Sequence, residues 1–225
     1  MFHSIQNDCL RTEFSFLQDC FPSTFTWAQD AFGTGPPDAV NLWIGNERAI
    51  SSMHKDHYEN LFYVLSGEKI FTLCPPADVV FLYEHEYDSG EFVERQSVDV
   101  ESGNRQWTVQ ANDGEKVTWI GPDIQTLLPG DASETTTADA KSKSILLSMY
   151  PLLKYIHPIQ VRVQAGEMLY LPSLWFHRVT QSCETVGINY WFDMHFDSPN
   201  WCYFHLLQEM RALSTTSISA QHEEP

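Results

Sequence analysis

Apolar residues recur along this chain in short runs that are rich in β-branched and aromatic residues. The runs are bounded by Gly, Pro, Ser and Asp, a pattern typical of strands that end in turns. They are "VNLWI" (40–44), "LFYVL" (61–65), "KIFTL" (69–73), "IQVRVQAGEMLYLPSLWFHRV" (159–179) and "TVGINYWFDMHFD" (185–197). The link Ser66-Gly67-Glu68 predicts a hairpin between two of them. Because no helix alternates regularly with these runs, the pattern predicts a mainly β fold, an antiparallel sandwich or barrel.

The segments around these runs differ in composition and divide the chain. Residues 1–39 carry apolar residues at mixed helical spacing, which predicts a helical or irregular lead-in before a main domain over 40–197. Within that domain, residues 84–116 are rich in Asp and Glu and predict an acidic, solvent-facing insert. Residues 127–144 are small and polar, which predicts a mobile loop.

The end of the chain predicts a helix over 198–214 and a disordered tail over 215–225. Ser198 is expected as the N-cap of this helix, with Pro199 in its first turn. We expect one face of the helix to carry Tyr203, Leu206, Leu207 and Met210.

Composition and charge limit the partners of the chain. Its 225 residues are 43% hydrophobic, which is sufficient for one packed core. A net charge of -17 would repel phosphate backbones and anionic lipids, so no nucleic-acid or membrane partner is expected, whereas a basic protein would be attracted. No run approaches the roughly 20 apolar residues of a membrane span, and the start lacks the pattern of a signal peptide. We therefore predict a soluble protein of the cytoplasm, with the nucleus also open to it.

The cysteines indicate no disulfide framework and no structural zinc site. They are Cys9, Cys20, Cys74, Cys183 and Cys202. Their number is odd and none forms a CxxC pair, so we predict reduced, mostly buried thiols.

A histidine followed two residues later by an acid would place both side chains on one face of a strand, which suits metal ligation. Such pairs include His54/Asp56, His57/Glu59 and His195/Asp197. With nine histidines and thirty acidic residues, chance alone produces such pairs, so each by itself is more simply a surface pair. His177, inside an apolar run, offers a third ligand to the first pair. Two histidines and one carboxylate are the ligands of non-haem Fe(II) oxygenases, although a zinc hydrolase could use the same set.

Lys69 opens an apolar run and is either an exposed edge charge or a buried cation that awaits an anion. If a metal held one end of a dicarboxylate cosubstrate, the other carboxylate would need a cation, and a charge-assisted hydrogen bond there is worth about 1.5–3 kcal/mol. The metal triad and Lys69 therefore support one another. In this interpretation the other polar residues nearby are solvated: Lys55, His57, Glu59 and Glu68.

Several motifs resemble the Jumonji-C (JmjC) family of Fe(II)- and 2-oxoglutarate-dependent oxygenases. They are "HKD" (54–56), Lys69 fifteen positions after His54, "GEMLYLPSLWFH" (166–177) and "GINYWFD" (187–193). The resemblance runs from about residue 5 to about residue 210 and is weakest across 94–145. It implies a double-stranded β-helix, a cupin-like or jelly-roll fold, with flanking helices. Within the family, the chain is similar to the small lysyl hydroxylases.

The resemblance also implies a role for individual residues. His54, Asp56 and His177 would bind Fe(II), and Lys69 would bind the distal carboxylate of 2-oxoglutarate, with dioxygen as the third reactant. Ser51 would join that carboxylate, while Asn60 and Asn189 would line the pocket. No catalytic residue beyond the metal ligands is expected. Two features depart from the family: the N-terminal segment is short, which predicts a fragment or an isoform, and "MFHSIQ" lacks the tyrosine that relatives supply to the cosubstrate.

The function implied by the resemblance is hydroxylation of lysine at C3 in a protein. The expected partners are the developmentally regulated GTP-binding proteins, lysine-bearing GTPases of the translation-factor class, and a homodimer is one expected assembly. Three alternatives stay open: an N-methyl-lysine demethylase, a truncated and non-catalytic β-helix binding module, and a zinc or manganese cupin enzyme. The last leaves Lys69 unexplained.

Overall fold

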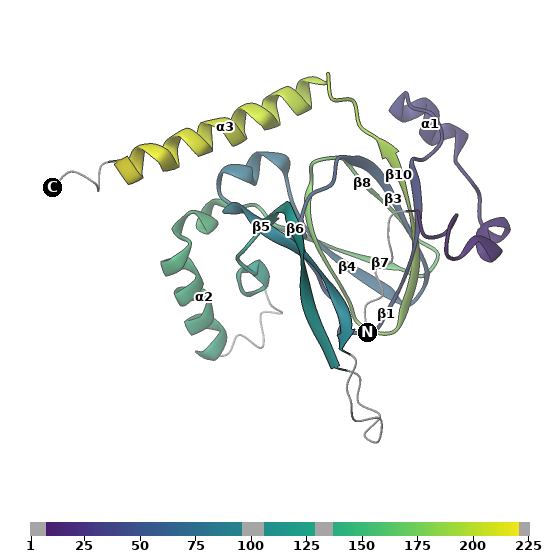
Figure 1. The fold of residues 1–225 in the computed structure, drawn as a ribbon, viewed down its shortest axis with the longest axis horizontal. Helices are drawn as coiled ribbons and strands as arrows, with labels where there is room; N and C mark the ends of the chain where they lie inside the picture. Colours follow the sequence, from purple (N-terminus) through teal and green to yellow (C-terminus); the bar gives the residue numbers. More distant parts are fainter. Residues whose placement is uncertain (1–7, 96–105, 129–136, 221–225) are drawn as a thin grey trace.

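A computed structural model describes residues 8–95, 106–128 and 137–220 (Figure 1). Within these residues, two four-stranded antiparallel sheets have the strand orders β1-β10-β3-β8 and β2-β9-β4-β7. The first sheet contains β1 (Ala39–Gly45), β3 (Tyr58–Ser66), β8 (Met168–Leu171) and β10 (Thr185–Asp193). The second contains β2 (Ser51–His54), β4 (Glu68–Cys74), β7 (Ile159–Gln164) and β9 (Phe176–Gln181).

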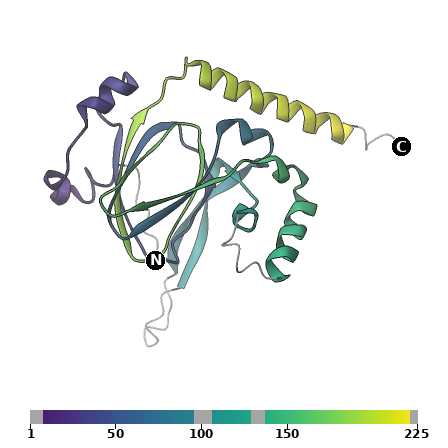
Figure 2. The same ribbon diagram turned by 180° about the vertical axis from the view of Figure 1, so that it is seen from behind.

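The two sheets face each other and enclose one interior, which both views of the ribbon show (Figures 1 and 2). Strands that follow one another in the chain alternate between the sheets, apart from β4 and β7. This is the topology of a jelly roll, so the predicted fold class is confirmed. Apolar side chains of both sheets meet in the interior: Phe62, Val64, Phe71, Leu73, Val163 and Leu171.

The link Ser66-Gly67-Glu68 joins the two sheets and does not close a hairpin, which corrects the sequence prediction. β3 pairs with β10 and β8, whereas β4 pairs with β9 and β7. Gly67 has a φ of 80°, and a Cβ there would overlap the backbone oxygen of Glu184. The turn therefore requires glycine. Turn residues show where the chain reverses, but not which strand becomes the neighbour.

Residues 75–158 form an excursion between β4 and β7, two strands that pair directly. Its elements are η2 (Pro76–Val80), β5 (Glu84–Arg95), β6 (Gln106–Ile120), η3 (Ile124–Leu127), α2 (Thr137–Met149) and η4 (Pro151–Tyr155). β5 and β6 pair as a two-stranded ribbon, which includes most of the predicted acidic insert over 84–116. Residues 96–105 of that insert lie outside the described part of the chain.

The predicted mobile loop over 127–144 is wrong at both ends. Leu127 ends η3, and α2 begins at Thr137, while residues 129–136 lie outside the described part. Leu146 and Leu147, near the end of α2, pack against a buried apolar cluster. This packing stabilises a helix whose first turns are too polar to be recognised from composition.

The lead-in covers the outer face of the first sheet. It contains η1 (Ser15–Cys20) and α1 (Thr26–Phe32), drawn in purple in Figure 1 beside β10 and β1. Leu10 and Phe25 pack with Ile188 and Tyr190 of β10. Residues 1–7 of the predicted lead-in over 1–39 lie outside the described part.

Helix α3 (Pro199–Ala220) extends away from the sandwich (Figure 1). The hydroxyl of Ser198 accepts a hydrogen bond from the backbone N–H of Trp201 at 3.3 Å, which caps the helix. Phe204 is buried with Leu207 beside it, whereas three of the residues expected to share one face with Leu207 are more than half exposed: Tyr203, Leu206 and Met210. The helix also continues past residue 214, so the predicted tail over 215–225 is wrong up to Ala220, and 221–225 lie outside the described part.

All five cysteines are free thiols, but only Cys9 and Cys74 are buried. The prediction of mostly buried thiols is therefore wrong, since Cys20, Cys183 and Cys202 are exposed. No helix in the described ranges combines the length and apolar character needed to cross a membrane.

A buried ion pair joins the excursion and α3 to the sandwich. Lys55 lies in the link between β2 and β3, and its Nζ pairs with a carboxylate oxygen of Glu84 at the start of β5. The two side chains are 9% and 6% exposed. The ammonium also lies 5.4 Å from the ring centroids of Phe176 and Phe204. Gln208 of α3 donates to the second oxygen of Glu84 at 2.7 Å.

We expect Glu84→Ala to lower the free energy of unfolding by about 3–5 kcal/mol, because it leaves the Lys55 ammonium buried without an anion. The double variant Lys55→Met/Glu84→Leu removes both charges and should lose less than about 1 kcal/mol. Urea denaturation followed by fluorescence measures both. Equal losses in the two variants would contradict the importance of the unpaired charge.

Candidate metal centre

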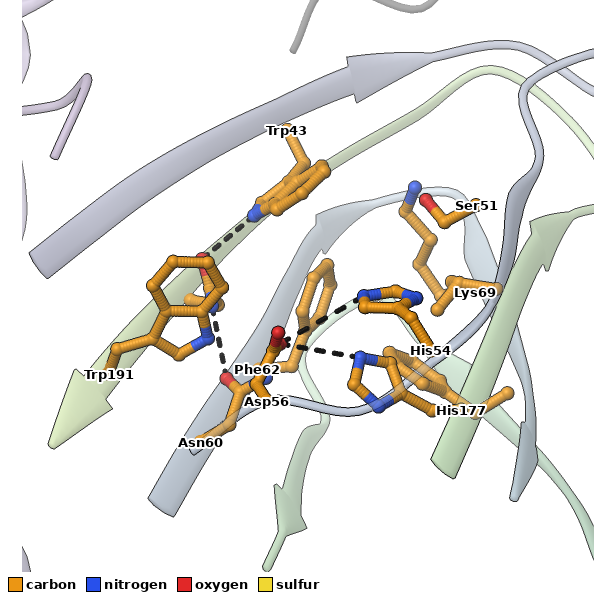
Figure 3. A pocket seen from close by; sticks show the side chains of 12 residues that line it. Trp43, Ser51, His54, Asp56, Asn60, Phe62, Lys69, His177 and Trp191 are labelled. Carbon is orange, nitrogen blue, oxygen red and sulfur yellow. Dashed lines mark hydrogen bonds and ion pairs between the residues drawn. The ribbon is translucent and has the colours of Figure 1, made fainter. Parts of the chain in front are cut away.

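Three side chains predicted as metal ligands meet in the interior between the two sheets (Figure 3). The Nε2 atoms of His54 and His177 lie 4.0 Å and 3.6 Å from one carboxylate oxygen of Asp56. All three ligand atoms lie within 4.8 Å of one another. No other group of three potential ligands was found in the described part of the chain.

The ligands come from three different places in the fold. His54 ends β2 and lies opposite His177 of the neighbouring strand β9. Asp56 lies beyond the end of β2, so the expectation that His54 and Asp56 share a strand face is wrong. The backbone oxygen of Asp56 instead accepts a hydrogen bond from the N–H of Leu174 at 2.9 Å, which holds the link against the segment before β9.

Hydrogen bonds prepare both imidazoles for metal binding. His54 Nδ1 lies 2.7 Å from the backbone oxygen of Ser52, and His177 Nδ1 lies 3.0 Å from that of Trp175. Because a carbonyl oxygen only accepts, each Nδ1 carries the proton and each Nε2 keeps its lone pair. Burial, and then the closeness of the second imidazole, lower the pKa of His177 to about 4, so this ring is neutral near pH 7. The donor set therefore suits a divalent metal, and two histidines with one carboxylate leave coordination positions open for other ligands.

Lys69 lies on the same inner face of the second sheet as His177 and is 4% exposed. Its Nζ donates to the side-chain oxygen of Gln181, the residue opposite it on β9. Gln181 Nε2 donates to the backbone oxygen of Asn46 at 2.6 Å, which leaves its amide oxygen free to receive Lys69. In the described ranges Lys69 forms no ion pair with a carboxylate, and burial lowers its pKa to about 8. A buried ammonium held by a neutral amide is an anion-binding group.

A chain of hydrogen bonds orients two asparagines on the facing sheet. Trp43 Nε1 donates to Asn189 Oδ1 at 2.8 Å, and Asn189 Nδ2 donates to Asn60 Oδ1 at 3.1 Å. An indole N–H can only donate, so it determines which amide atom of Asn189 is the oxygen, and Asn189 in turn determines this for Asn60. The amide N–H₂ of Asn60 is left as a donor at the pocket that both asparagines line.

The remaining predicted residue, Ser51, lines the same pocket on β2. Ser51 and His54 are three positions apart, an odd spacing that would turn them to opposite faces of a regular strand. A register irregularity between them lets both face the pocket. Trp119 of β6 stacks on His54 with ring centroids 4.7 Å apart, so the ribbon forms part of the metal centre's surroundings.

Sequence reasoning missed four residues here: Trp43, Gln181, Trp119 and Trp191. Gln181 carried a signal, because it lies four positions after His177 on one strand and so faces the same side. The tryptophans carried none, since aromatic residues in strands are ordinary core residues.

The prediction that Lys55, His57, Glu59 and Glu68 are solvated neighbours is wrong for some of these residues. Lys55 is a buried ion-pair partner, and Glu59 accepts hydrogen bonds from Tyr170 and Ser173, so neither is merely solvated. Glu68 pairs with Arg162 at 2.7 Å. The pairs His57/Glu59 and His195/Asp197 contribute nothing to the metal centre, as the chance argument indicated.

Comparisons with known proteins agree with this geometry. Residues 2–198 match the cupin-like domain family. The chain is 41% identical over 214 residues to JmjC domain-containing protein E of Dictyostelium discoideum and 40% identical over 209 residues to lysine-specific demethylase JMJ32 of Arabidopsis thaliana. It is 38% identical over 178 residues to bifunctional peptidase and (3S)-lysyl hydroxylase JMJD7 of Homo sapiens.

These alignments cover 91%, 91% and 79% of this chain, but 56%, 55% and 48% of the respective relatives. The chain thus spans about half the length of the curated relatives it matches. The part that it spans contains the jelly roll, the three clustered ligands and the buried lysine. The chain belongs to the cupin-like JmjC domain family.

Proposed function

We propose that the chain is an Fe(II)- and 2-oxoglutarate-dependent protein hydroxylase that acts on lysine at C3. JmjC family members use Fe(II) and 2-oxoglutarate. The observation that carries the proposal is the buried Lys69, which lacks an anionic partner in the described residues and lines one pocket with His54, Asp56 and His177. A dicarboxylate that reaches from a metal to Lys69 satisfies both sites at once.

In this proposal the residues of the pocket bind the metal and different parts of the cosubstrate. His54, Asp56 and His177 hold Fe(II), which, when bound with 2-oxoglutarate and dioxygen, supplies the oxidising chemistry. Lys69, fixed by Gln181 and assisted by Ser51, binds the distal carboxylate. The pre-oriented Asn60 amide donates to ligand oxygens beside the metal.

The assignment of lysine as the target residue is based on similarity to the human relative, whose name includes (3S)-lysyl hydroxylase. Our proposal extends to a lysine-bearing GTPase of the translation-factor class, the developmentally regulated GTP-binding proteins, and to action in the cytoplasm. The net charge of -17 would attract a basic partner. A homodimer stays a prediction.

A second candidate function is N-methyl-lysine demethylation. It is favoured by the similarity to the Arabidopsis relative that is named a lysine-specific demethylase. The same metal and cosubstrate serve both reactions, and only the carbon that lies nearest the metal differs.

Replacement of a metal ligand tests the central proposal. We expect Asp56→Ala to reduce Fe(II)-dependent succinate formation from 2-oxoglutarate at least about 100-fold, because two imidazoles alone hold the metal weakly. Asp197→Ala is a matched control, since Asp197 also follows a histidine by two residues but lies outside the metal centre, and it should retain activity. Undiminished succinate formation by Asp56→Ala would contradict the assignment of the ligands.

The pH dependence tests the role of Lys69. Its pKa of about 8 in the free protein means that the ammonium loses its proton as the pH rises through this value, and an anion then binds less well. We expect the KM for 2-oxoglutarate to be about tenfold higher near pH 9 than near pH 7. Lys69→Arg keeps its charge over this range and should lack the increase. A KM that is constant with pH in the parent protein argues against Lys69 as the binding group.

Mass spectrometry of reacted peptides separates the two candidate reactions. With an unmodified lysine peptide, hydroxylation adds the mass of one oxygen atom. With an N-methyl-lysine peptide, demethylation removes the mass of one CH₂ group. We expect the first product; exclusive formation of the second would establish the demethylase instead.

A further inference from the structure

Side chains of opposite charge flank the pocket that contains the metal centre: Lys69 lines it, whereas Asp38 and Asp193 lie outside its lining, near Trp191. Lys69 provides a positive charge on one side, and Figure 3 shows Trp191 on the other side of Asp56. Around Trp191 lie an aromatic partner and two carboxylates. We refer to these four residues as the acidic rim: Asp38, Tyr58, Trp191 and Asp193.

The strand register brings the acidic rim together. Asp193 of β10 lies opposite Tyr58 of β3, and Trp191 lies opposite Asn60. Because side chains alternate along a strand, Tyr58, Trp191 and Asp193 face the same side as Asn60, which lines the pocket. The rings of Tyr58 and Trp191 are parallel, with centroids 5.0 Å apart.

Asp38 joins the rim from just before β1. Its backbone N–H donates to the oxygen of Trp191 at 2.7 Å, and its carboxylate accepts the Tyr58 hydroxyl at 3.1 Å. These two contacts fix the carboxylate beside the stacked rings.

The two carboxylates of the rim are not neutralised within the described ranges. Neither Asp38 nor Asp193 forms an ion pair there. Arg11 is a neighbouring cation, but its carboxylate partner is Asp8 at 2.5 Å, and its other hydrogen bonds among the described residues go to the backbone oxygens of Pro37 and Asp38. The rim is therefore a region of negative potential that is open to a cation.

Trp191 contributes a second, independent sign of a ligand. Its Nε1 is buried and has no hydrogen-bond partner among the described residues, although buried indole N–H groups nearly always have one. Figure 3 shows this nitrogen on the edge of the ring that faces Asp56. A carbonyl oxygen of a bound peptide would satisfy this donor.

We propose that the acidic rim binds the cationic side chain of a lysine in the protein substrate, while the Trp191 N–H donates to a carbonyl oxygen of the same peptide. This rests on the proposed function, since it names the residues that select the substrate of that pocket. The arrangement separates two ligands by charge: the anionic cosubstrate goes to Lys69 and the cationic substrate to Asp38 and Asp193. Lys69 repels the cationic substrate side chain, and the two carboxylates of the rim repel the anionic cosubstrate.

Binding of a fluorescent peptide with one lysine between neutral residues tests the proposal, with the same peptide carrying norleucine as the uncharged comparison. Anisotropy of the full chain at low ionic strength should show the lysine peptide bound at least about tenfold more tightly. In Asp38→Asn/Asp193→Asn this preference should fall below about twofold. Both substitutions keep the size of the side chain, and the amide oxygen introduced at position 38 could still accept the hydrogen bond of Tyr58.

A matched control and a second variant separate charge from shape. Asp113→Asn/Glu115→Gln removes the same two charges from exposed positions of β6 and should keep the preference for lysine. Trp191→Phe keeps a ring but removes the donor, so it should weaken both peptides by a similar factor, about fivefold. A wild-type protein without preference for lysine, or an unchanged preference in the Asp38/Asp193 variant, would overturn the proposal. If Trp191→Phe bound both peptides as tightly as the wild type does, the proposed role of the Trp191 donor would be wrong.

The measurement involves no turnover, so it fails independently of the proposed function. If the parent protein forms no succinate from 2-oxoglutarate, the oxygenase activity is wrong whatever the peptides do. If succinate forms but the rim variants bind both peptides as the wild type does, only the assignment of the acidic rim is wrong.

Discussion

The need of a buried ammonium for a partner governs both the stability of this protein and its site. Removal of a lysine from water costs several kcal/mol unless an anion compensates. Lys55 meets this need inside the molecule, through Glu84, and so joins the metal-binding link to the ribbon and to α3. Lys69 has no anionic partner among the described residues and donates to the amide of Gln181, and burial lowers its pKa. One lysine thus completes the fold, whereas the other leaves a place for an anion.

Groups that can only donate or only accept hydrogen bonds determine the orientation of the polar side chains inside the sandwich. Carbonyl oxygens determine the protonated nitrogen of both histidines, and the indole of Trp43 determines the orientation of two successive asparagines. A ligand that enters therefore meets donors and lone pairs that are already directed, so little reorganisation opposes binding. The exception is Trp191, whose donor has no partner among the described residues.

Charged side chains lie on both sides of the metal ligands. The metal ligands lie between a cation and an acidic rim, and the ribbon β5–β6 reaches the same place through Trp119. The jelly roll supplies this arrangement because strands distant in the chain, β1, β3 and β10 on one side and β2, β4 and β9 on the other, face one interior.

The fold class and the central site were accessible from the sequence by itself. Short apolar runs indicate strands because alternation is a local property, and the motif around His54, Asp56, Lys69 and His177 reports a family through residue types and spacing. Only the tertiary structure decided which strands are neighbours, that Lys55 is buried, that α2 is a helix, and that Tyr203 faces solvent while Phe204 does not. Each of these depends on contacts between residues far apart in the chain, such as Lys55 with Glu84 or Tyr58 with Asp38 and Trp191. Local sequence determines what a segment can form, but burial and partners are properties of the packed molecule.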